Sequence, residues 1–296
     1  PAFLPAQVWN GQDTLYGVEW VSPGTNTLRL AVAEDGLYRI SAQELQQAGL
    51  PVGTSGADLR LYCLGREAPL WLSEEGPLSG NDFVAFYGKK GRSELDRHLF
   101  AAPEAEMLNP GYGLFTDTLV YFLRWDEPAA APRRYQEMPN DLSNPPAALP
   151  WATFAERRNF HQQHVQKRYD ADNLVALSHF DVCEGFAAPY QTQHELSLEL
   201  PGFYAADPQA ELRLRMASWF ADEQQLQVSA NGELLHQQSY GPYELIDLQL
   251  PLPEAAAQPQ VDVLLQGLNG NLDRYALSEV ELRYRRTFDF NGETQA

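Results

Sequence analysis

Alternation of apolar and polar residues in the last third of the chain constrains the fold more than any other feature of the sequence. The period is two in 194–200 (HELSLEL), 211–216 (ELRLRM), 225–228, 245–250 (LIDLQL), 261–265 and 277–284. Successive side chains of a strand point to opposite faces of its sheet, so each segment predicts a strand with one buried face. Turn signals separate the segments, among them Asn231-Gly232, which favours a two-residue hairpin. Together they predict a β-sandwich of jelly-roll type over 191–296.

Short apolar runs in the first 135 residues predict a second, mainly β domain. The expected strands are 27–33, 37–40, 59–64, 70–72, 83–88 and 118–125. The last of these is the most apolar and is expected to be central in its sheet. The turn at 34–36 contains a glycine that tolerates positive φ, so it predicts that the first two strands pair as a hairpin.

One short helix is expected in this N-terminal domain. Ser41 and Glu44 have the spacing of a capping box, in which each side chain bonds the other residue's backbone amide. The helix is predicted over 42–48, with Gly49 as its C-terminal stop and Pro51 beyond.

Six prolines between 126 and 150 indicate an extended connector, because proline fits neither a helix interior nor a central strand. Residues 154–169 are polar and compatible with a helix. We therefore predict an N-terminal domain over 1–135, a connector with a helix over 136–190 and the sandwich over 191–296.

Acidic residues outnumber basic ones 40 to 21, which gives a net charge of −19. This excess disfavours nucleic acid and anionic membrane surfaces as partners, because both need clustered Lys and Arg. No apolar run approaches the roughly 18–20 residues of a membrane span. The start at Pro1 and the tail NGETQA suggest a trimmed piece, so we expect the natural protein to continue beyond Ala296.

Catalytic signals are sparse. His161 and His164 could share a metal with His179 or Glu184, but neighbouring Arg and Lys disfavour a cation there, so a solvated helix face is the preferred interpretation. Cys183 with His179 is a candidate nucleophile pair, although no glycine elbow flanks it.

Other pairings are equally weak. The acidic pairs Glu74-Glu75 and Asp181 with Glu184 are expected by chance in so acidic a chain. Cys63 and Cys183 lie in apolar contexts and are predicted to be buried thiols, with a disulfide left open. We predict no catalytic, cofactor or metal residue.

Two groups of residues are candidates for ligand binding. Asn269, Asn271 and Asp273 form an oxygen-rich loop that could hold calcium, but it lacks the full ligand set of a known calcium loop, and a plain turn is the alternative. The aromatic residues Trp219, Phe220, Tyr240 and Tyr243 could face a sugar or instead fill the core.

Several motifs occur in an order that resembles a known family. They are EDGLYRIS (34–41), ADLRLYCLG (57–65), GPLSGNDFVAFYG (76–88) and NPGYGLFTDTLVYFL (109–123). The closing LDRYALSEVELRYRRTF (272–288) resembles a last sandwich strand before a peptidase domain. The order is similar to the non-catalytic N-terminal region of gingipain-like cysteine peptidases, a family that includes the type IX secretion sortase. At 183–186, CEGF replaces a Trp-Tyr-Gly-Glu-Phe-like motif, so the match is looser there.

This resemblance implies an ancillary, non-enzymatic region of a larger exported protein, located in the periplasm, at the outer membrane or outside the cell. The peptidase His and Cys of the family come after this region, so no catalytic residue is carried over. The implied partner is a downstream peptidase-like domain of the same polypeptide, which this region would support or mask. The alternatives are a module that binds a carbohydrate or a cell-surface protein and, third, a hydrolase in its own right.

Overall fold

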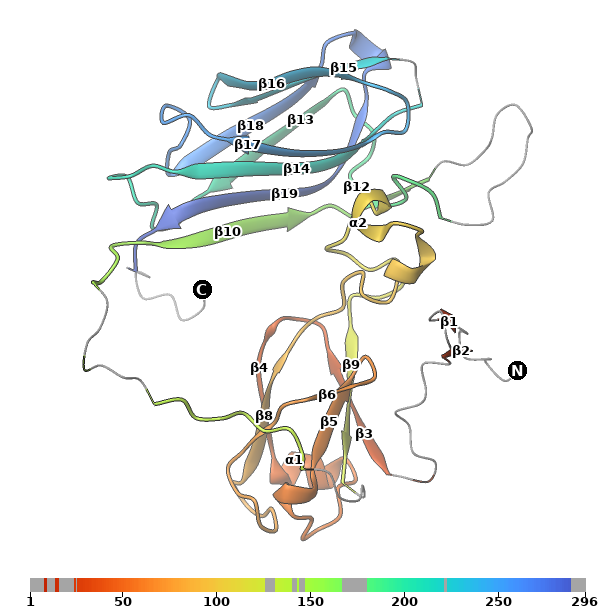
Figure 1. The fold of residues 1–296 in the computed structure, drawn as a ribbon, viewed down its shortest axis with the longest axis vertical. Coiled ribbons are helices and arrows are strands. Elements are labelled where there is room, and N and C mark those ends of the chain that lie inside the picture. Colours follow the sequence, from red (N-terminus) through yellow and green to blue (C-terminus); the bar gives the residue numbers. More distant parts are fainter. Residues whose placement is uncertain are drawn as a thin grey trace. The chain divides into compact units, whose positions relative to one another are not determined.

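The computed structural model describes residues 8–9, 14–15, 24, 26–125, 131–139, 143, 147–166, 180–220 and 223–288. The chain forms two compact units. The first contains Pro1–Gly91 and Thr116–Asp141, and the second contains Arg92–Phe115 and Leu142–Ala296. Strands dominate both units and the helices are short, which confirms the predicted mainly β fold (Figure 1). In contrast to the predicted segments, 92–115 groups with the C-terminal sandwich.

Two sheets and one helix make up most of the first unit. The four-stranded sheet has the order β3 (Thr27–Val32), β9 (Leu119–Arg124), β5 (Arg60–Cys63) and β6 (Arg66–Ala68). The three-stranded sheet has the order β4 (Gly36–Ser41), β8 (Phe83–Gly88) and β7 (Trp71–Leu72). A separate ladder joins β1 (Val8–Trp9) to β2 (Thr14–Leu15), and the 3₁₀ turn η1 spans Gly56–Asp58.

The core of the first unit draws on both sheets and the helix. Leu45, Leu61, Phe86 and Leu123 are among its fully buried members. Burial of a side chain of this size contributes roughly 1.5–3 kcal/mol. Strand β9 pairs with β3 on one side and with β5 on the other, which confirms its predicted central position.

The predicted helix is present as α1 (Ala42–Gln47), with its capping box. Ser41 Oγ accepts a hydrogen bond from the Glu44 amide at 3.2 Å, and Glu44 Oε2 accepts one from the Ser41 amide at 2.8 Å. These bonds satisfy two amides that the first helical turn leaves open. Gly49 then adopts a φ of 116°, which a side chain would disfavour, and the helix ends there.

The hairpin predicted for 27–33 and 37–40 is wrong. Strand β3 pairs with β9, and β4 pairs with β8, so the turn at 34–36 carries the chain from one sheet to the other. Pairing with these distant apolar strands places both segments against one core. An isolated two-stranded hairpin could not bury its apolar face in this way.

Eight antiparallel strands form a sandwich in the second unit. One sheet has the order β10 (Ala152–Asn159), β19 (Tyr275–Arg286), β14 (Ala210–Ser218) and β17 (Leu245–Pro251). The other has the order β13 (Gln193–Glu199), β18 (Gln260–Gly267), β15 (Gln224–Ala230) and β16 (Glu233–Tyr240). Counted from one to eight along the chain, the orders are 1-8-3-6 and 2-7-4-5. This is the double Greek key of a jelly roll, as predicted.

Alternation within these strands matches the predicted burial. On β14, Leu212, Leu214 and Met216 are fully buried in the core between the sheets, and Arg213 points outward. The turn Asn231-Gly232 joins β15 to β16 with φ values of 46° and 82°, as its sequence predicts.

The helix predicted within 154–169 is wrong for the described part of that segment. Ala152–Asn159 is strand β10, which pairs along its length with β19, and β11 (Gln163–Val165) pairs with β12 (Gly185–Ala187). Strand β10 lies at a sheet edge, so its polar residues remain outside the core without helical periodicity. Residues 167–179 lie outside the described part.

Residues 92–115 belong to the second unit, although the segments before and after them belong to the first. They contain the 3₁₀ turn η2 (Arg97–Leu99) and helix α2 (Pro103–Glu106). Asn109 secures this segment, because its Nδ2 donates to the carbonyl oxygens of Phe160 and Phe186 at 3.0 Å. The backbone therefore passes between the units three times, after Gly91, Phe115 and Asp141. The 3₁₀ turn η3 (Gly270–Leu272) precedes β19. No helix among the described residues is long and apolar enough to cross a membrane.

Candidate functional site

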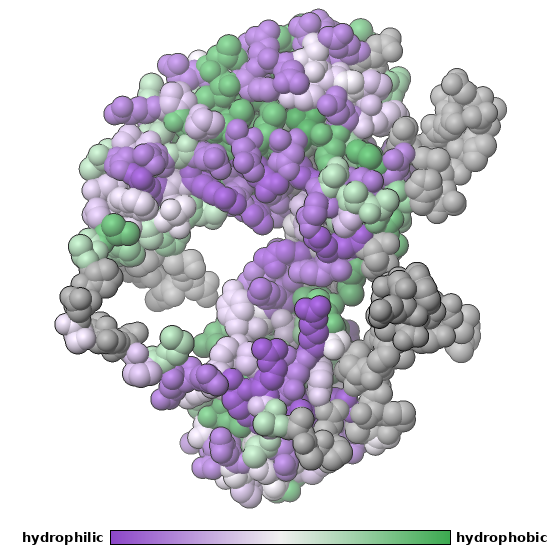
Figure 2. All heavy atoms as spheres, in the orientation of Figure 1, coloured by the Kyte–Doolittle hydropathy of each residue, from purple (hydrophilic) through white to green (hydrophobic). Residues whose placement is uncertain are grey.

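Charged side chains cover the outer face of the sheet β10-β19-β14-β17, which we call the ionic face. Strand register places Arg157 opposite Glu281, and Glu281 opposite Arg213 on the next strand. Arg157 Nε donates to Glu281 Oε2 at 2.7 Å, and Arg213 donates two bonds to Asp247 at 2.9 and 2.7 Å. Figure 2 shows hydrophilic side chains over much of the visible surface of the sandwich.

The ion pairs control the protonation of two carboxyl groups. Burial alone would raise the pKa of Asp247, but hydrogen bonds and positive charge from Arg213 and Arg215 lower that pKa below its ordinary value. Glu281 is only 1% exposed, and burial would likewise raise its pKa. Hydrogen bonds and charge from Arg157 and Arg283 outweigh burial there, so the net effect is a lowered pKa. Both groups are therefore stabilised as carboxylates.

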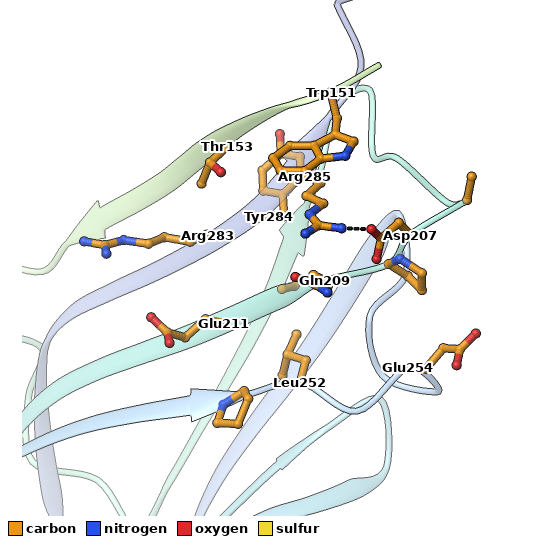
Figure 3. Close-up of a pocket in the computed structure, with 14 residues that line it drawn as sticks. Trp151, Thr153, Asp207, Gln209, Glu211, Leu252, Glu254, Arg283, Tyr284 and Arg285 are labelled. Carbon is orange, nitrogen blue, oxygen red and sulfur yellow. Dashed lines mark ion pairs between the residues drawn. The ribbon is translucent and has the colours of Figure 1, made fainter. Parts of the chain in front are cut away.

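A hollow of about 670 Å³ opens at one end of the ionic face, and we call it the Trp151 hollow. The Arg285 guanidinium lies 4.0 Å from the centre of the Trp151 ring and forms an ion pair with Asp207. Figure 3 shows the Arg285 side chain beside the indole with its guanidinium directed to Asp207. The cation stacked on the ring fixes the half-buried indole at the rim of the hollow.

Polar groups of both kinds line the rest of the hollow. Glu211 and Glu254 are carboxylates with no ion pair or side-chain hydrogen bond to another described residue, and Thr153, Gln209 and Arg283 supply donors (Figure 3). Such a mixture can bind hydroxyl or ammonium groups. The lining contains neither cysteine nor histidine.

The predicted ligand-facing aromatic residues separate into two environments. Trp219 and Phe220 have ring centres 4.0 Å apart, Arg274 lies 4.5 Å from the Trp219 ring centre, and Phe220 is 55% exposed. Tyr240 belongs to the core, where its hydroxyl contacts His236 Nε2 at 2.8 Å and burial raises its pKa to about 12. Tyr243 donates its amide to the Trp219 carbonyl at 3.1 Å. A ligand on Trp219, Phe220 and Tyr243 stays a prediction.

The loop suggested for calcium is organised by Asp273. This side chain is fully buried, and its Oδ2 accepts a hydrogen bond from the Asn269 amide at 2.6 Å. The Asn271 carbonyl accepts from Arg274 Nε at 3.0 Å. The carboxylate thus accepts a hydrogen bond from the start of its own loop, four residues earlier. Calcium at Asn269, Asn271 and Asp273 stays a prediction.

The histidine and cysteine candidates are dispersed. His161 stacks on Tyr112 with ring centres 4.5 Å apart, and His164 on β11 lies edge-on to Phe186. The shared helix face expected for the two histidines is therefore wrong. Cys183 is buried, and its Sγ contacts the Tyr243 carbonyl at 3.2 Å; neither it nor Cys63 is in a disulfide. His179 lies outside the described residues, so the pair with Cys183 stays untested.

Sequence reasoning missed the Trp151 hollow entirely. Its lining comes from the start of β10, the end of β19, the loop before β14 and the segment after β17. No local spacing in the sequence connects these four places. Only the strand register, such as Glu211 opposite both Arg283 and Pro251, brings them together.

No protein-family model matches the sequence, and no curated protein matches it. Among solved structures the chain is similar to dimeric latent PorU from Porphyromonas gingivalis, with a TM-score of 0.59 and 11% identity over 90% of this chain. The match covers 25% of PorU, so this chain spans about a quarter of that protein's length. At this identity the similarity shows the fold alone.

Two carbohydrate-binding modules show weaker similarity. One is the CBM36-1 domain of a multidomain xylanase from the hindgut metagenome of Trinervitermes trinervoides, with a TM-score of 0.26 and 8% identity over 44% of this chain and 96% of the module. The other is a CBM36 module in complex with calcium and xylotriose, with a TM-score of 0.25 and 10% identity over 44% of this chain and 98% of the module. Scores this low carry no argument about function.

Proposed function

We propose that this chain is a non-catalytic, ancillary region of a larger exported protein of the gingipain-like cysteine peptidase type, and that it supports or masks the catalytic domain. The similarity to latent PorU over 90% of the chain is the observation that carries the proposal. The ordered motifs at 34–41, 57–65, 76–88 and 109–123 give it independent support from the sequence.

Masking has a direct physical route. A folded module that docks over a cleft excludes substrate without any chemistry of its own, and preformed modules bind with little backbone change. The ionic face and the Trp151 hollow offer oriented charges that could set the register of such docking. In this proposal the downstream peptidase-like domain of the same polypeptide is the partner.

The test adds this chain in trans to the separately expressed peptidase-like domain that the proposal takes as its partner. We expect peptidase activity to fall, or the thermal stability of the peptidase to change, at micromolar concentrations of the chain. An unrelated jelly-roll protein of similar net charge controls for the effect of adding an acidic protein. The absence of any effect on activity and on stability would count against the proposal, as would a reading frame without a downstream His and Cys.

A second candidate function is a module that binds a carbohydrate or another cell-surface component. The observation in its favour is the Trp151 hollow, where an indole stands beside carboxylate, amide and guanidinium groups on a jelly-roll sandwich. A glycan array separates the two functions, because saturable binding supports this one and is not required by masking. Peptide and glycoside reporter substrates test the third alternative, hydrolysis by the chain itself.

A further inference from the structure

The outer face of the second sheet of the sandwich, β13-β18-β15-β16, carries an aligned row of amides. Register places Gln193 opposite Gln266, Gln266 opposite Gln227, and Gln227 opposite Gln237. We call these four residues the glutamine row. Leu226 and Val228 on either side of Gln227 are buried in the core, so Gln227 and the three glutamines in register with it point outward. Because neighbouring strands lie about 4.8 Å apart, the row spans roughly 14 Å across the sheet.

This face differs in charge from the ionic face. Its four strands contain no lysine or arginine, although the opposite sheet is rich in arginine. The acidic outward residues Glu195, Glu199 and Asp262 lie on β13 and the early part of β18, at one side of the face. Asp262 accepts hydrogen bonds from Ser197 and Gln260, and Glu195 accepts one from Gln193. The middle of the sheet is polar and uncharged.

The row next to the glutamines supplies apolar contact area and a hollow. It consists of Glu195, Leu264, Ser229 and Leu234, again in register across the four strands. Leu234 is 59% exposed, and Leu264 is half-buried. A hollow of about 570 Å³ opens here, with Ser197, Ser229 and Leu264 in its lining.

The glutamine amides keep most of their hydrogen-bonding capacity. Gln227 Nε2 reaches Gln237 Oε1 at 3.4 Å, a long bond, and the Gln266 side chain bonds no other described residue. A primary amide offers two N–H donors and a carbonyl acceptor. A sugar hydroxyl is likewise both donor and acceptor, so amides match it without introducing charge.

We propose that the glutamine row and the adjoining Leu264 and Leu234 bind a neutral oligosaccharide that lies across the strands. Amides contact the hydroxyl groups, and the two leucines contact the C–H faces of the rings. The length of the row fits an extended oligomer better than a single sugar. This inference rests on the second proposed function and adds to the Trp151 hollow a separate binding surface on the opposite sheet of the sandwich; it is independent of masking.

The test measures binding of soluble neutral oligosaccharides (cello-, xylo-, manno- and galacto-series) to the full chain by calorimetry. We expect saturable binding that changes little with salt, because no ion pair forms. The double variant Q227A/Q266A should bind about tenfold more weakly, since each hydrogen-bonded contact is worth about 1 kcal/mol or less and 1.4 kcal/mol is tenfold. The matched control is Gln249→Ala, an exposed glutamine on β17 of the opposite sheet, which should bind like the wild type.

Thermal unfolding of all variants accompanies the titrations, so a loss of affinity with an unchanged melting temperature is assigned to the surface. Glycan binding that Q227A/Q266A leaves intact would overturn this location but keep the second proposed function. No binding to any of the four series would overturn this inference, whereas the glycan array decides the second proposed function. A wild-type dimer that becomes monomeric in Q227A/Q266A would show that a second copy covers the face, and would also overturn the inference. Q227A/Q266A should retain any effect on the peptidase domain, which keeps masking separate.

Discussion

The guanidinium of Arg215 donates two hydrogen bonds to the carbonyl oxygen of Met107, from Nε at 3.0 Å and from Nη2 at 2.6 Å. Nη2 also reaches the Glu104 carbonyl at 3.2 Å, and Nη1 pairs with Asp247. A strand of the sandwich thus places a positive charge at the C-terminal end of α2, where the helix carbonyls lack partners. This contact ties 92–115 to the sandwich.

Arg215→Met should destabilise the second unit by about 3–5 kcal/mol, because it removes a buried charge and leaves two carbonyls and Asp247 with fewer donors. Chemical denaturation measures the change. Arg283→Met is the control on the same face: its side chain is 51% exposed, and its partner Glu281 keeps Arg157. We expect that variant to lose about 1 kcal/mol or less. Equal losses in both variants would contradict the assigned role of Arg215.

The substitution Asn109→Asp should weaken the attachment of residues 92–115 to the sandwich. The Asn109 amide donates to three carbonyls, at 3.0 Å to Phe160, 3.0 Å to Phe186 and 3.4 Å to Ser278, and a carboxylate can donate to none of them. The cost should be about 2–3 kcal/mol, with faster hydrogen exchange across 92–115. The same change at exposed Asn271 should alter neither quantity. Unchanged exchange in Asn109→Asp would show that other contacts hold the segment.

Stability should fall at acidic pH through the carboxylates of the ionic face. In the unfolded chain Asp247 and Glu281 titrate near 3.8 and 4.5, and the folded state lowers both pKa values. The unfolded state therefore takes up protons first as the pH falls, so their contribution is complete above about pH 5 and is lost below it.

Asp247→Asn tests this relationship. The variant should be less stable than the wild type at neutral pH and should lose less further stability between about pH 5 and pH 3. Glu254→Gln removes an exposed carboxyl outside the ion pairs and serves as the control. Parallel pH profiles of stability for wild type and Asp247→Asn would contradict the ion pairs as the cause of the stability loss at acidic pH.

The two thiols should react at different rates in the native protein. Cys183 is 1% exposed, whereas Cys63 is partly exposed, and neither is in a disulfide. A thiol reagent should modify Cys63 quickly and should modify Cys183 only when the fold opens. Cys63→Ser should abolish the fast phase, and Cys183→Ser should keep it. In denaturant without reductant, fewer than two reactive thiols would indicate a disulfide.

The sequence predicted those elements whose signal is local. The alternation over 194–284, the capping box at Ser41 and Glu44, and the Asn231-Gly232 turn each became the expected structure. In these places the side-chain period or the φ requirement of a single residue determines the backbone. The mainly β class followed directly from them.

Features that depend on distant pairing were missed. Strand β10 is polar because it lies at a sheet edge and faces outward to partners such as Glu281, and polarity of this kind also occurs on helices. The pairing of β3 with β9 instead of β4 depends on a shared core that no short window contains. For the same reason the sequence did not predict that a single hollow is lined by Trp151, Arg285 and Glu211.

The three passages of the backbone between the units affect what cleavage can do. A protease that cut the proline-rich stretch at 126–150 would yield two polypeptides, but the N-terminal one would still carry 92–115. That portion is seated in the other fragment through Asn109 and Arg215, so the nicked halves should stay together until they are denatured. Cleavage in this stretch would therefore break the chain without separating the two fragments.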